Sequence, residues 1–331
     1  HSYVCPAHNL LGCQKLIVNT MVPAGTLVPT NNHRTRVDLI SSPDTSTPDV
    51  RDRDEDVFTG NVDLERLDTI LADGNVSIVV IEAFADGQHP FSLQNLRAAG
   101  ALARRYGVRL VVDGSRVVEN AWYIQKHEAG CADRTVADIV RQIAKTSTVF
   151  MLDGAHDPKC NTGGLLSTDN PDDYEVLMNR VVVYEGLHTY GGMAGRDMEA
   201  MAIGIREAVM EEHQASRIGQ VRYLGDMLRE AGIPIVNPIG SHAIFIDARE
   251  FLPHVDQDDY PAQSLAAELY LEAGIRTMER GNVSAGRDPL TGKQEVNSRL
   301  IHLADKDVLA SQYQIGNGDF APLFDLGRLH L

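Results

Sequence analysis

The chain has 331 residues and a formal net charge of −16, because 30 Lys and Arg stand against 46 Asp and Glu. This charge argues against a nucleic-acid partner or an anionic membrane surface, since both attract basic proteins and repel acidic ones. The apolar content of 43%, the four sparse cysteines and the lack of an apolar run near ~20 residues predict a cytoplasmic globular protein without a membrane span.

Between residues 57 and 153 the chain alternates amphipathic helices with short apolar runs. Helices are predicted over 62–73, 92–106 and 134–145, and strands over 77–85, 108–115 and 146–153. This alternation is typical of βαβ units around a buried parallel sheet. Residues 163–169 could add one more strand, running antiparallel. We therefore predict an α/β fold with a mainly parallel sheet.

The C-terminal part has a different pattern. Residues 194–231 are strongly helical and end before Gly232, a candidate helix C-cap. A strand over 242–249, a helix over 261–273 and a strand near 299–303 predict a small α+β domain. We expect a large α/β domain over 1–205, followed by a long helix and a small C-terminal domain over 206–331.

Three acids, Asp86, Asp113 and Asp153, lie at the carboxyl ends of the three predicted parallel strands. Ligands of open α/β sheets bind in the crevice beyond those ends, so these carboxylates could line a polar crevice. The alternative is that each acid caps the turn or helix that follows it. Arg116 and His156 each lie three residues after a strand-end acid. The Asp-x-x-His pair could hold a metal or let the carboxylate orient the imidazole.

Three long segments carry a resemblance to a known family. They are VVDGSRVVENAWYIQKHE (111–128), VVVYEGLHTYGGMAGRDMEAMAIGIREAV (181–209) and PAQSLAAELYLEAGIRTMERGNVSAGRDPLTGKQ (261–294). The chain resembles the tyrosine phenol-lyase and tryptophanase family, β-eliminating lyases that use pyridoxal phosphate, from about residue 1 to about residue 305. The resemblance implies a fold-type-I, aminotransferase-like fold. From the resemblance we expect that the family's N-terminal arm is missing and that its C-terminal region is shortened.

The resemblance also implies roles for individual residues. Asp113 matches the acid that pairs with the coenzyme's pyridine nitrogen, and Arg116 matches the arginine beside its ring oxygen. Arg287 and Arg299 match the arginines that hold the substrate carboxylate and shape the side-chain site. Asn161 matches a position of a monovalent-cation site. The implied partners are an amino-acid-like substrate and a second copy of the chain, in a homodimer or homotetramer.

The sequence departs from the family where the coenzyme is held. His156 occupies the position of the lysine that forms the Schiff base, and an imidazole has no primary amine. Asp153 replaces a phosphate-binding serine, and residues 9–11 (Asn-Leu-Leu) replace the Gln-Gly-Arg phosphate loop. Lys159 could replace the lysine only in a shifted register. We therefore expect that this chain does not use pyridoxal phosphate, although the family implies it.

Histidines and carboxylates at the vacated positions could instead bind a metal ion or haem. The candidate ligands are His156, Asp153, His33 and His8, which would suit iron, manganese or zinc. Cys5, His8 and Cys13 have the rough spacing of a metal knuckle but lack a second pair, which favours a structural role.

The first functional hypothesis is an enzyme that breaks a C–C or C–heteroatom bond of a tyrosine- or tryptophan-like amino acid without pyridoxal phosphate. His156 would be its base or metal ligand, with Asp113 and Arg116 shaping the site. The second hypothesis is a non-catalytic binding or partner subunit that retains the fold. The third is a conventional lyase that uses Lys159.

Overall fold

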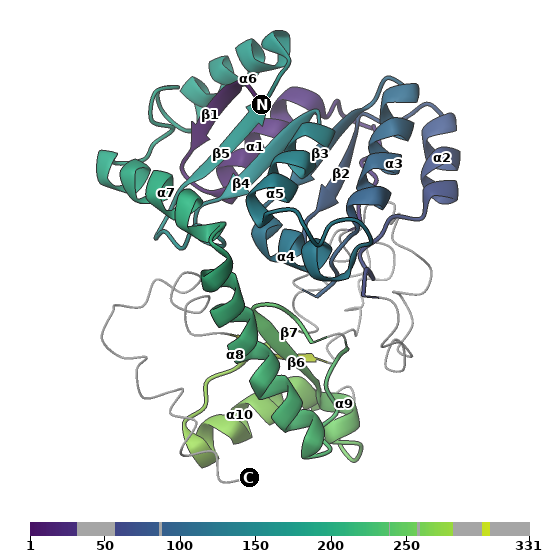
Figure 1. The fold of residues 1–331 in the computed structure, drawn as a ribbon, viewed down its shortest axis with the longest axis vertical. Helices are drawn as coiled ribbons and strands as arrows, with labels where there is room; N and C mark the ends of the chain where they lie inside the picture. Colours follow the sequence, from purple (N-terminus) through teal and green to yellow (C-terminus); the bar gives the residue numbers. More distant parts are fainter. Residues whose placement is uncertain (32–56, 86–87, 238, 257–258, 281–299, 305–331) are drawn as a thin grey trace. The chain divides into compact units, whose positions relative to one another are not determined.

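The computed structural model describes residues 1–31, 57–85, 88–237, 239–256, 259–280 and 300–304. Contacts divide the described chain into two compact units, the first ending at Ala215 and the second beginning at Ser216. Figure 1 shows the elements of both units. Four residues of the predicted crevice, His33, Asp86, Arg287 and Arg299, lie outside the described residues.

The first unit is built on a five-stranded sheet. Its strands are β1 (Tyr3–Ala7), β2 (Ile78–Glu82), β3 (Arg109–Asp113), β4 (Val149–Asp153) and β5 (Gly164–Thr168), in the order β1-β5-β4-β3-β2. β2, β3 and β4 pair in parallel, whereas β5 is antiparallel to both β4 and β1. Four of the five strands therefore run in one direction, which confirms the predicted mainly parallel sheet and the antiparallel strand at 163–169.

Helices cover both faces of this sheet. They are α1 (Leu10–Met21), α2 (Leu64–Ala72), α3 (Leu93–Arg105), α4 (Val117–His127), α5 (Val136–Thr146), α6 (Pro171–Tyr184) and α7 (Gly195–Ala208). Side chains alternate along each strand, so Val111 and Met151 pack with α1 and α6, whereas Val112 and Leu152 pack with α2, α3, α4 and α5. The result is a helix–sheet–helix sandwich (Figure 1).

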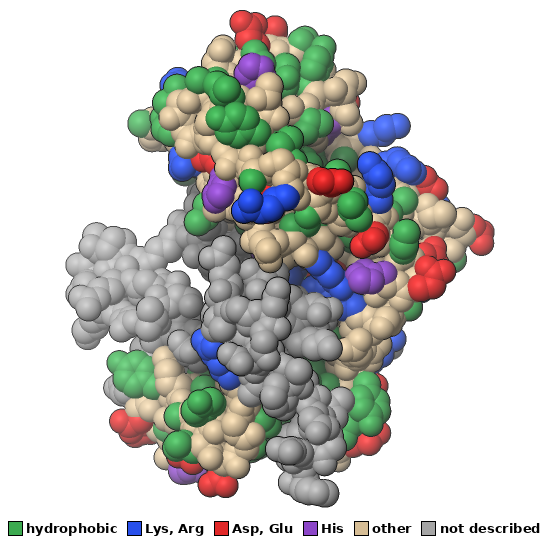
Figure 2. Space-filling model, turned by 90° about the vertical axis from the view of Figure 1, so that its left-hand side faces the viewer, with side chains coloured by type: hydrophobic (Ala, Val, Ile, Leu, Met, Phe, Trp, Pro, Cys, Tyr) green, Lys and Arg blue, Asp and Glu red, His purple; other side chains and the backbone are tan. Residues whose placement is uncertain are grey.

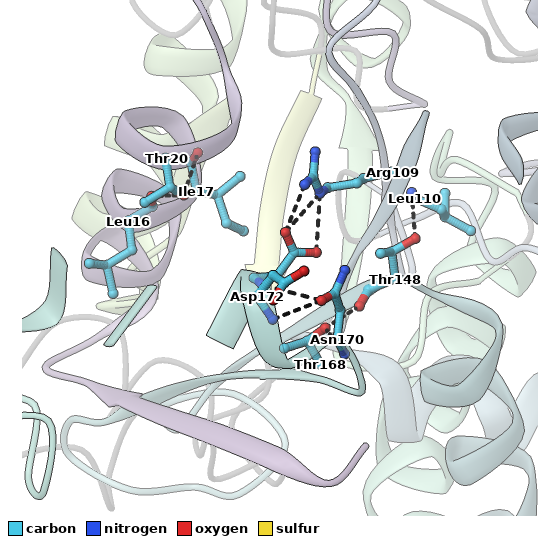
Figure 3. Close-up of polar contacts among 10 residues, drawn as sticks. Leu16, Ile17, Thr20, Arg109, Leu110, Thr148, Thr168, Asn170 and Asp172 are labelled. Carbon is cyan, nitrogen blue, oxygen red and sulfur yellow. Dashed lines mark hydrogen bonds and ion pairs between the residues drawn. The ribbon is translucent and has the colours of Figure 1, made fainter. Parts of the chain in front are cut away.

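A polar network ties the strand starts to α6 (Figure 3). Arg109, at the start of β3, donates from Nη2 and Nε to the Asp173 carboxylate of α6 over 2.8–3.1 Å. Thr148 accepts from the Leu110 amide at 3.1 Å, and Thr168 donates to the Thr148 carbonyl at 2.9 Å. These contacts lie at the opposite end of β3 and β4 from the predicted crevice.

The second unit contains most of α8 (Glu211–Glu230), then β6 (Ala243–Asp247), α9 (Ala248–Phe251), α10 (Pro261–Ala273), β7 (Met278–Arg280) and β8 (Leu300–Ala304). Its sheet has the order β6-β8-β7 and is antiparallel. The predicted elements at 242–249, 261–273 and 299–303 are therefore confirmed. Within the described ranges, no helix combines the length and apolarity that crossing a bilayer requires.

The helical region predicted over 194–231 is two helices rather than one. α7 ends at Ala208 and α8 begins at Glu211. Gln214 Nε2 donates to the Ala208 carbonyl oxygen at 2.8 Å, and the Gln214 side chain is buried. This side chain satisfies one of the carbonyl groups that the end of α7 leaves without a helical partner.

Candidate active site

Two of the predicted strand-end acids are the last residues of adjacent parallel strands. Asp113 ends β3 opposite Met151, and Asp153 ends β4 two residues beyond Met151. Residues two apart on a strand share a face, so both carboxylates point to the side of the sheet that α1 covers. Both are buried, with 5% and 6% of their surface exposed. Residue 114 is glycine because a Cβ there would lie 2.2 Å from the Phe150 ring.

Asp153 is paired with His156 across the turn that follows β4. His156 Nδ1 contacts Asp153 Oδ2, while Asp153 Oδ1 accepts from the Ala155 amide at 3.1 Å. The His156 side chain is 17% exposed, and within the described residues its Nε2 makes no hydrogen bond. The contact is one of the two arrangements that the Asp-x-x-His spacing allowed, a carboxylate beside an imidazole. With Nδ1 held by a carboxylate, Nε2 is the atom presented outward.

Asp113 is held by its own strand-to-helix turn. Its Oδ1 accepts from the Ser115 amide at 3.0 Å and from Ser115 Oγ at 2.5 Å. Burial raises the pKa of the Asp113 carboxyl group, and the nearby Asp153 raises it further. The Ser115 hydrogen bonds and the charge of His156 oppose that rise in pKa. The three side chains therefore form one electrostatic cluster.

The loop that carries His156 connects the antiparallel strands β4 and β5. Gly154 N donates to the Gly163 carbonyl and Cys160 N to the Gly154 carbonyl, both at 2.8 Å. The His8 carbonyl accepts from Gly163 N at 2.9 Å and from Thr162 Oγ1 at 2.7 Å. His8 thus supports the loop through its backbone, whereas its side chain is exposed, as is that of Asn161.

No group of three or more metal-ligating side chains occurs among the described residues. Asp153 and His156 form a pair, but the exposed His8 side chain does not join them, and His33 lies outside the described residues. Cys5 and Cys13 are buried in the apolar layer beneath α1 and α6, so their knuckle-like spacing does not form a metal site with His8.

The beginning of α1 differs from a phosphate cradle. Asn9 caps the helix by accepting from Gly12 N at 2.9 Å, and Leu11, at the position of the family's phosphate-loop arginine, is 70% exposed. Lys15, one turn further on, bonds Glu185 Oε1 at 2.9 Å. With no amine on His156 and a carboxylate at Asp153, these two described residues do not fit pyridoxal phosphate held covalently at the family's lysine position.

Lys159, the alternative attachment residue, lies in the same turn as His156. Its amide donates to the His156 carbonyl at 3.1 Å, and its φ of +57° is in the left-handed region that lysine rarely adopts. The spacing of three residues therefore places the backbones of Lys159 and His156 close together. The use of the Lys159 amine in place of the family lysine stays a prediction.

Two residues that sequence reasoning missed hold the segments around the crevice. Asn120, fully buried on α4, accepts from Phe84 N at 3.1 Å and Phe91 N at 3.0 Å, and donates to the Phe91 carbonyl at 2.9 Å. Phe84 is itself fully buried with its ring against Tyr123. Asp157 Oδ2 accepts from Val118 N at 2.7 Å. Their partners are distant backbone amides, which leave no local pattern in the sequence.

The architecture matches that of a solved aminotransferase. An aminotransferase from Mycobacterium tuberculosis superposes with a TM-score of 0.58 at 14% identity, over 93% of this chain and 73% of that one. At this identity the match shows the fold alone. The class defined by the sheet, its helices and its strand-end site is therefore the fold-type-I, aminotransferase-like class.

Sequence comparison narrows this class to one family. Residues 22–313 match the family model described as beta-eliminating lyase. The tyrosine phenol-lyase of Nostoc punctiforme is 43% identical over 305 residues, and that of Intrasporangium calvum is 44% identical over 313. These matches cover 88% and 91% of this chain but 65% and 66% of the relatives, so the chain spans just under two thirds of their length. The chain belongs to the β-eliminating lyase family.

Proposed function

We propose that this protein is an enzyme that acts on an aromatic, tyrosine-like amino acid without covalently bound pyridoxal phosphate, with His156 as its general base. The substrate class rests on the relatives that carry the name tyrosine phenol-lyase. The observation that carries the proposal is the contact between His156 Nδ1 and Asp153 Oδ2. It lies where the family has the lysine that binds its coenzyme.

The geometry of this pair favours a base. A carboxylate at Nδ1 stabilises the tautomer in which Nε2 has a lone pair, and it also stabilises the imidazolium that forms when Nε2 takes a proton. The His156 side chain is 17% exposed, so part of the imidazole is accessible to a small molecule. Nε2 is also the atom that a metal would bind. We assign the base role because the described residues add no third ligand to the pair.

The remaining groups would orient the substrate. Arg116 is buried at the start of α4, three residues after Asp113, and a guanidinium group suits a carboxylate. Arg287 and Arg299, the other predicted carboxylate-binding residues, stay predictions. Ser115 holds one carboxylate oxygen of Asp113, Oδ1. The other oxygen would interact with a donor group of the ligand.

The test is turnover of a panel of aromatic amino acids by the purified chain without added coenzyme, followed by mass spectrometry of the products. We expect turnover that His156→Ala lowers by about 10²–10⁴-fold, the usual contribution of a general base. His254→Ala, at an exposed histidine of the second unit, is the matched control and should retain full activity.

The other hypotheses predict different outcomes of the same experiment. Borohydride reduction after addition of pyridoxal phosphate would attach the coenzyme to Lys159 if the chain is a conventional lyase. Binding of an aromatic amino acid without turnover, in the native chain and in His156→Ala alike, would instead identify a non-catalytic subunit. Either outcome contradicts the proposed base.

A further inference from the structure

We propose that Asp157 is a positioning residue, which fixes His156 relative to Asp113 and Arg116 by attaching the β4–β5 loop to the first turn of α4. This inference rests on the proposed role of His156. It adds a residue whose hydrogen bond to Val118 N joins it to the backbone of α4 rather than to a reacting group.

The contact itself is specific and buried. Asp157 is 1% exposed, and its Oδ2 accepts from Val118 N at 2.7 Å. Val118 is the second residue of α4, whose N-cap residue, Arg116, makes no side-chain capping hydrogen bond. The first amide groups of a helix have no helical partner, and the helix dipole makes that end positive. A carboxylate from the loop therefore supplies the acceptor that the N-cap residue does not, and its charge adds to that of Glu119 in the first turn of α4.

This contact joins the two chain segments that carry the site. On one side, His156 immediately precedes Asp157. On the other, Arg116 precedes α4 directly, and Asp113 lies four residues before α4 begins. The turn around His156 is closed by the bonds from Lys159 N to the His156 carbonyl and from Cys160 N to the Gly154 carbonyl. Because the turn is compact, a displacement of Asp157 moves the His156 backbone with it.

A second carboxylate in the same region makes a comparable contact away from the site. Glu128, at the other end of α4, accepts from Leu93 N at 2.7 Å and from Gln94 N at 2.9 Å, and so caps α3 from outside. The length of α4 separates it from Asp157 by roughly 15 Å. Glu128→Ala is therefore a control for the loss of a helix cap made between segments.

The experiment measures the His156 imidazole and turnover in the full chain. The nitrogen chemical shifts of the histidine rings are recorded by NMR at one fixed pH, and the His156 signals are identified by their loss in His156→Gln. We expect one dominant tautomer, with the proton on Nδ1, in the native chain. Asp157→Ala should average the two nitrogen shifts and lower turnover by about 10–100-fold, as the loss of an orienting contact does elsewhere.

Glu128→Ala should lower the thermal midpoint without changing the His156 shifts or turnover. Should Asp157→Ala fail to fold, Asp157→Glu keeps the charge but moves the loop by one methylene group, and it should alter the same shifts. Asp157→Asn keeps an acceptor oxygen for Val118 N. Its turnover should therefore stay within about five-fold of the native value, whereas the full loss of an orienting contact costs about 10–100-fold.

Native His156 shifts in folded Asp157→Ala or Asp157→Glu would overturn the inference, whatever the activity. Unchanged turnover in His156→Gln, together with His156 shifts that respond to Asp157, would overturn the base role but support the positioning role. The two proposals therefore fail separately.

Discussion

At the residue scale, the site follows from short-range spacing plus a few contacts that spacing cannot reveal. The pairing of Asp153 with His156 could be predicted, because three residues on a tight turn bring a carboxylate and an imidazole together. The contacts of Asn120 and Asp157 could not, because each accepts from backbone amides at least 29 residues away. Any polar side chain within reach could satisfy such an amide, so nothing in the local sequence marks the one that does.

Asp113 leads to a prediction with a defined pH dependence. Burial raises its pKa in the folded state, so between the unfolded and folded pKa values the native chain binds more protons than the unfolded chain. The free energy of unfolding therefore decreases as pH rises through that window. Asp113→Asn keeps an acceptor for Ser115 without the charge. We expect it to be more stable than the native chain at neutral pH, with the difference vanishing in acid.

Urea unfolding at several pH values checks this expectation, and Asp138→Asn provides a control of opposite sign. The Thr135 hydroxyl and nearby arginines lower the pKa of Asp138, so its contribution is present at neutral pH and is lost as pH falls through the folded pKa. A native chain that matches Asp113→Asn in stability at every pH would contradict the raised pKa of Asp113.

The cysteines give a second prediction at this scale. Burial raises the pKa of Cys5 to about 11, and burial with the charges of Asp113, Asp153 and Glu185 raises that of Cys13 well above its ordinary value. Because the thiolate is the reactive form, a rise of two units lowers the thiolate fraction at neutral pH by about 100-fold. Alkylation followed by peptide mass spectrometry should find Cys13 the slowest to react. Rapid labelling of Cys13 in the folded chain would show that the layer under α1 opens.

At the element scale, acids from other segments complete several helices. Asp157 caps α4, and Glu128 adds to the local Ser92 cap of α3, whereas α2 and α5 are capped locally by Asp63 and Thr135. Of the locally capped helices, α2, α3 and α5 were predicted close to their observed bounds, but α1 and α6 were not predicted. α4 was not predicted, because its own N-cap residue makes no side-chain capping hydrogen bond. In addition, eight of its eleven residues are buried, which removes the amphipathic pattern. α6 does have a start signal, Asn170 followed by Pro171 and two acids, so its omission was avoidable.

The link between β3 and α6 can be tested by removing one partner. Asp173 is almost fully buried, and Arg109 bonds it in a bidentate manner (Figure 3). Arg109→Ala would leave that carboxylate without its cation, and we expect a loss of about 1–3 kcal/mol in the free energy of unfolding, moderated by the partial exposure of Arg109. Arg141→Ala removes an exposed pair with Asp138 and should change stability by less than about 0.5 kcal/mol. Equal losses in both variants, measured by urea unfolding, would contradict this ranking.

At the scale of the whole molecule, the sequence predicted the parallel strands better than the antiparallel edge of the sheet. Apolar runs identify β2, β3 and β4 because helices cover both faces of a parallel sheet, including its edge strand β2. β1, at the opposite edge, was missed because it contains Pro6 and is defined by pairing with β5, more than 150 residues away. Proline is tolerated at such an edge. On the coloured part of the face shown in Figure 2, acidic and basic side chains are interspersed.

The net charge of −16 makes a prediction for the whole chain. Like charges repel most in the compact state, and salt weakens that repulsion as the Debye length falls from ~30 Å at about 0.01 M to ~10 Å at about 0.1 M. We expect the thermal midpoint to rise over this range, by a few degrees for about 1 kcal/mol of relieved repulsion. The measurement is a thermal melt in sodium, potassium and choline chloride at equal ionic strength. Screening predicts equal shifts for the three salts. A shift confined to potassium would instead indicate a bound monovalent cation. The variant to examine is then Asn161→Ala, because the family resemblance assigns the exposed Asn161 to such a site.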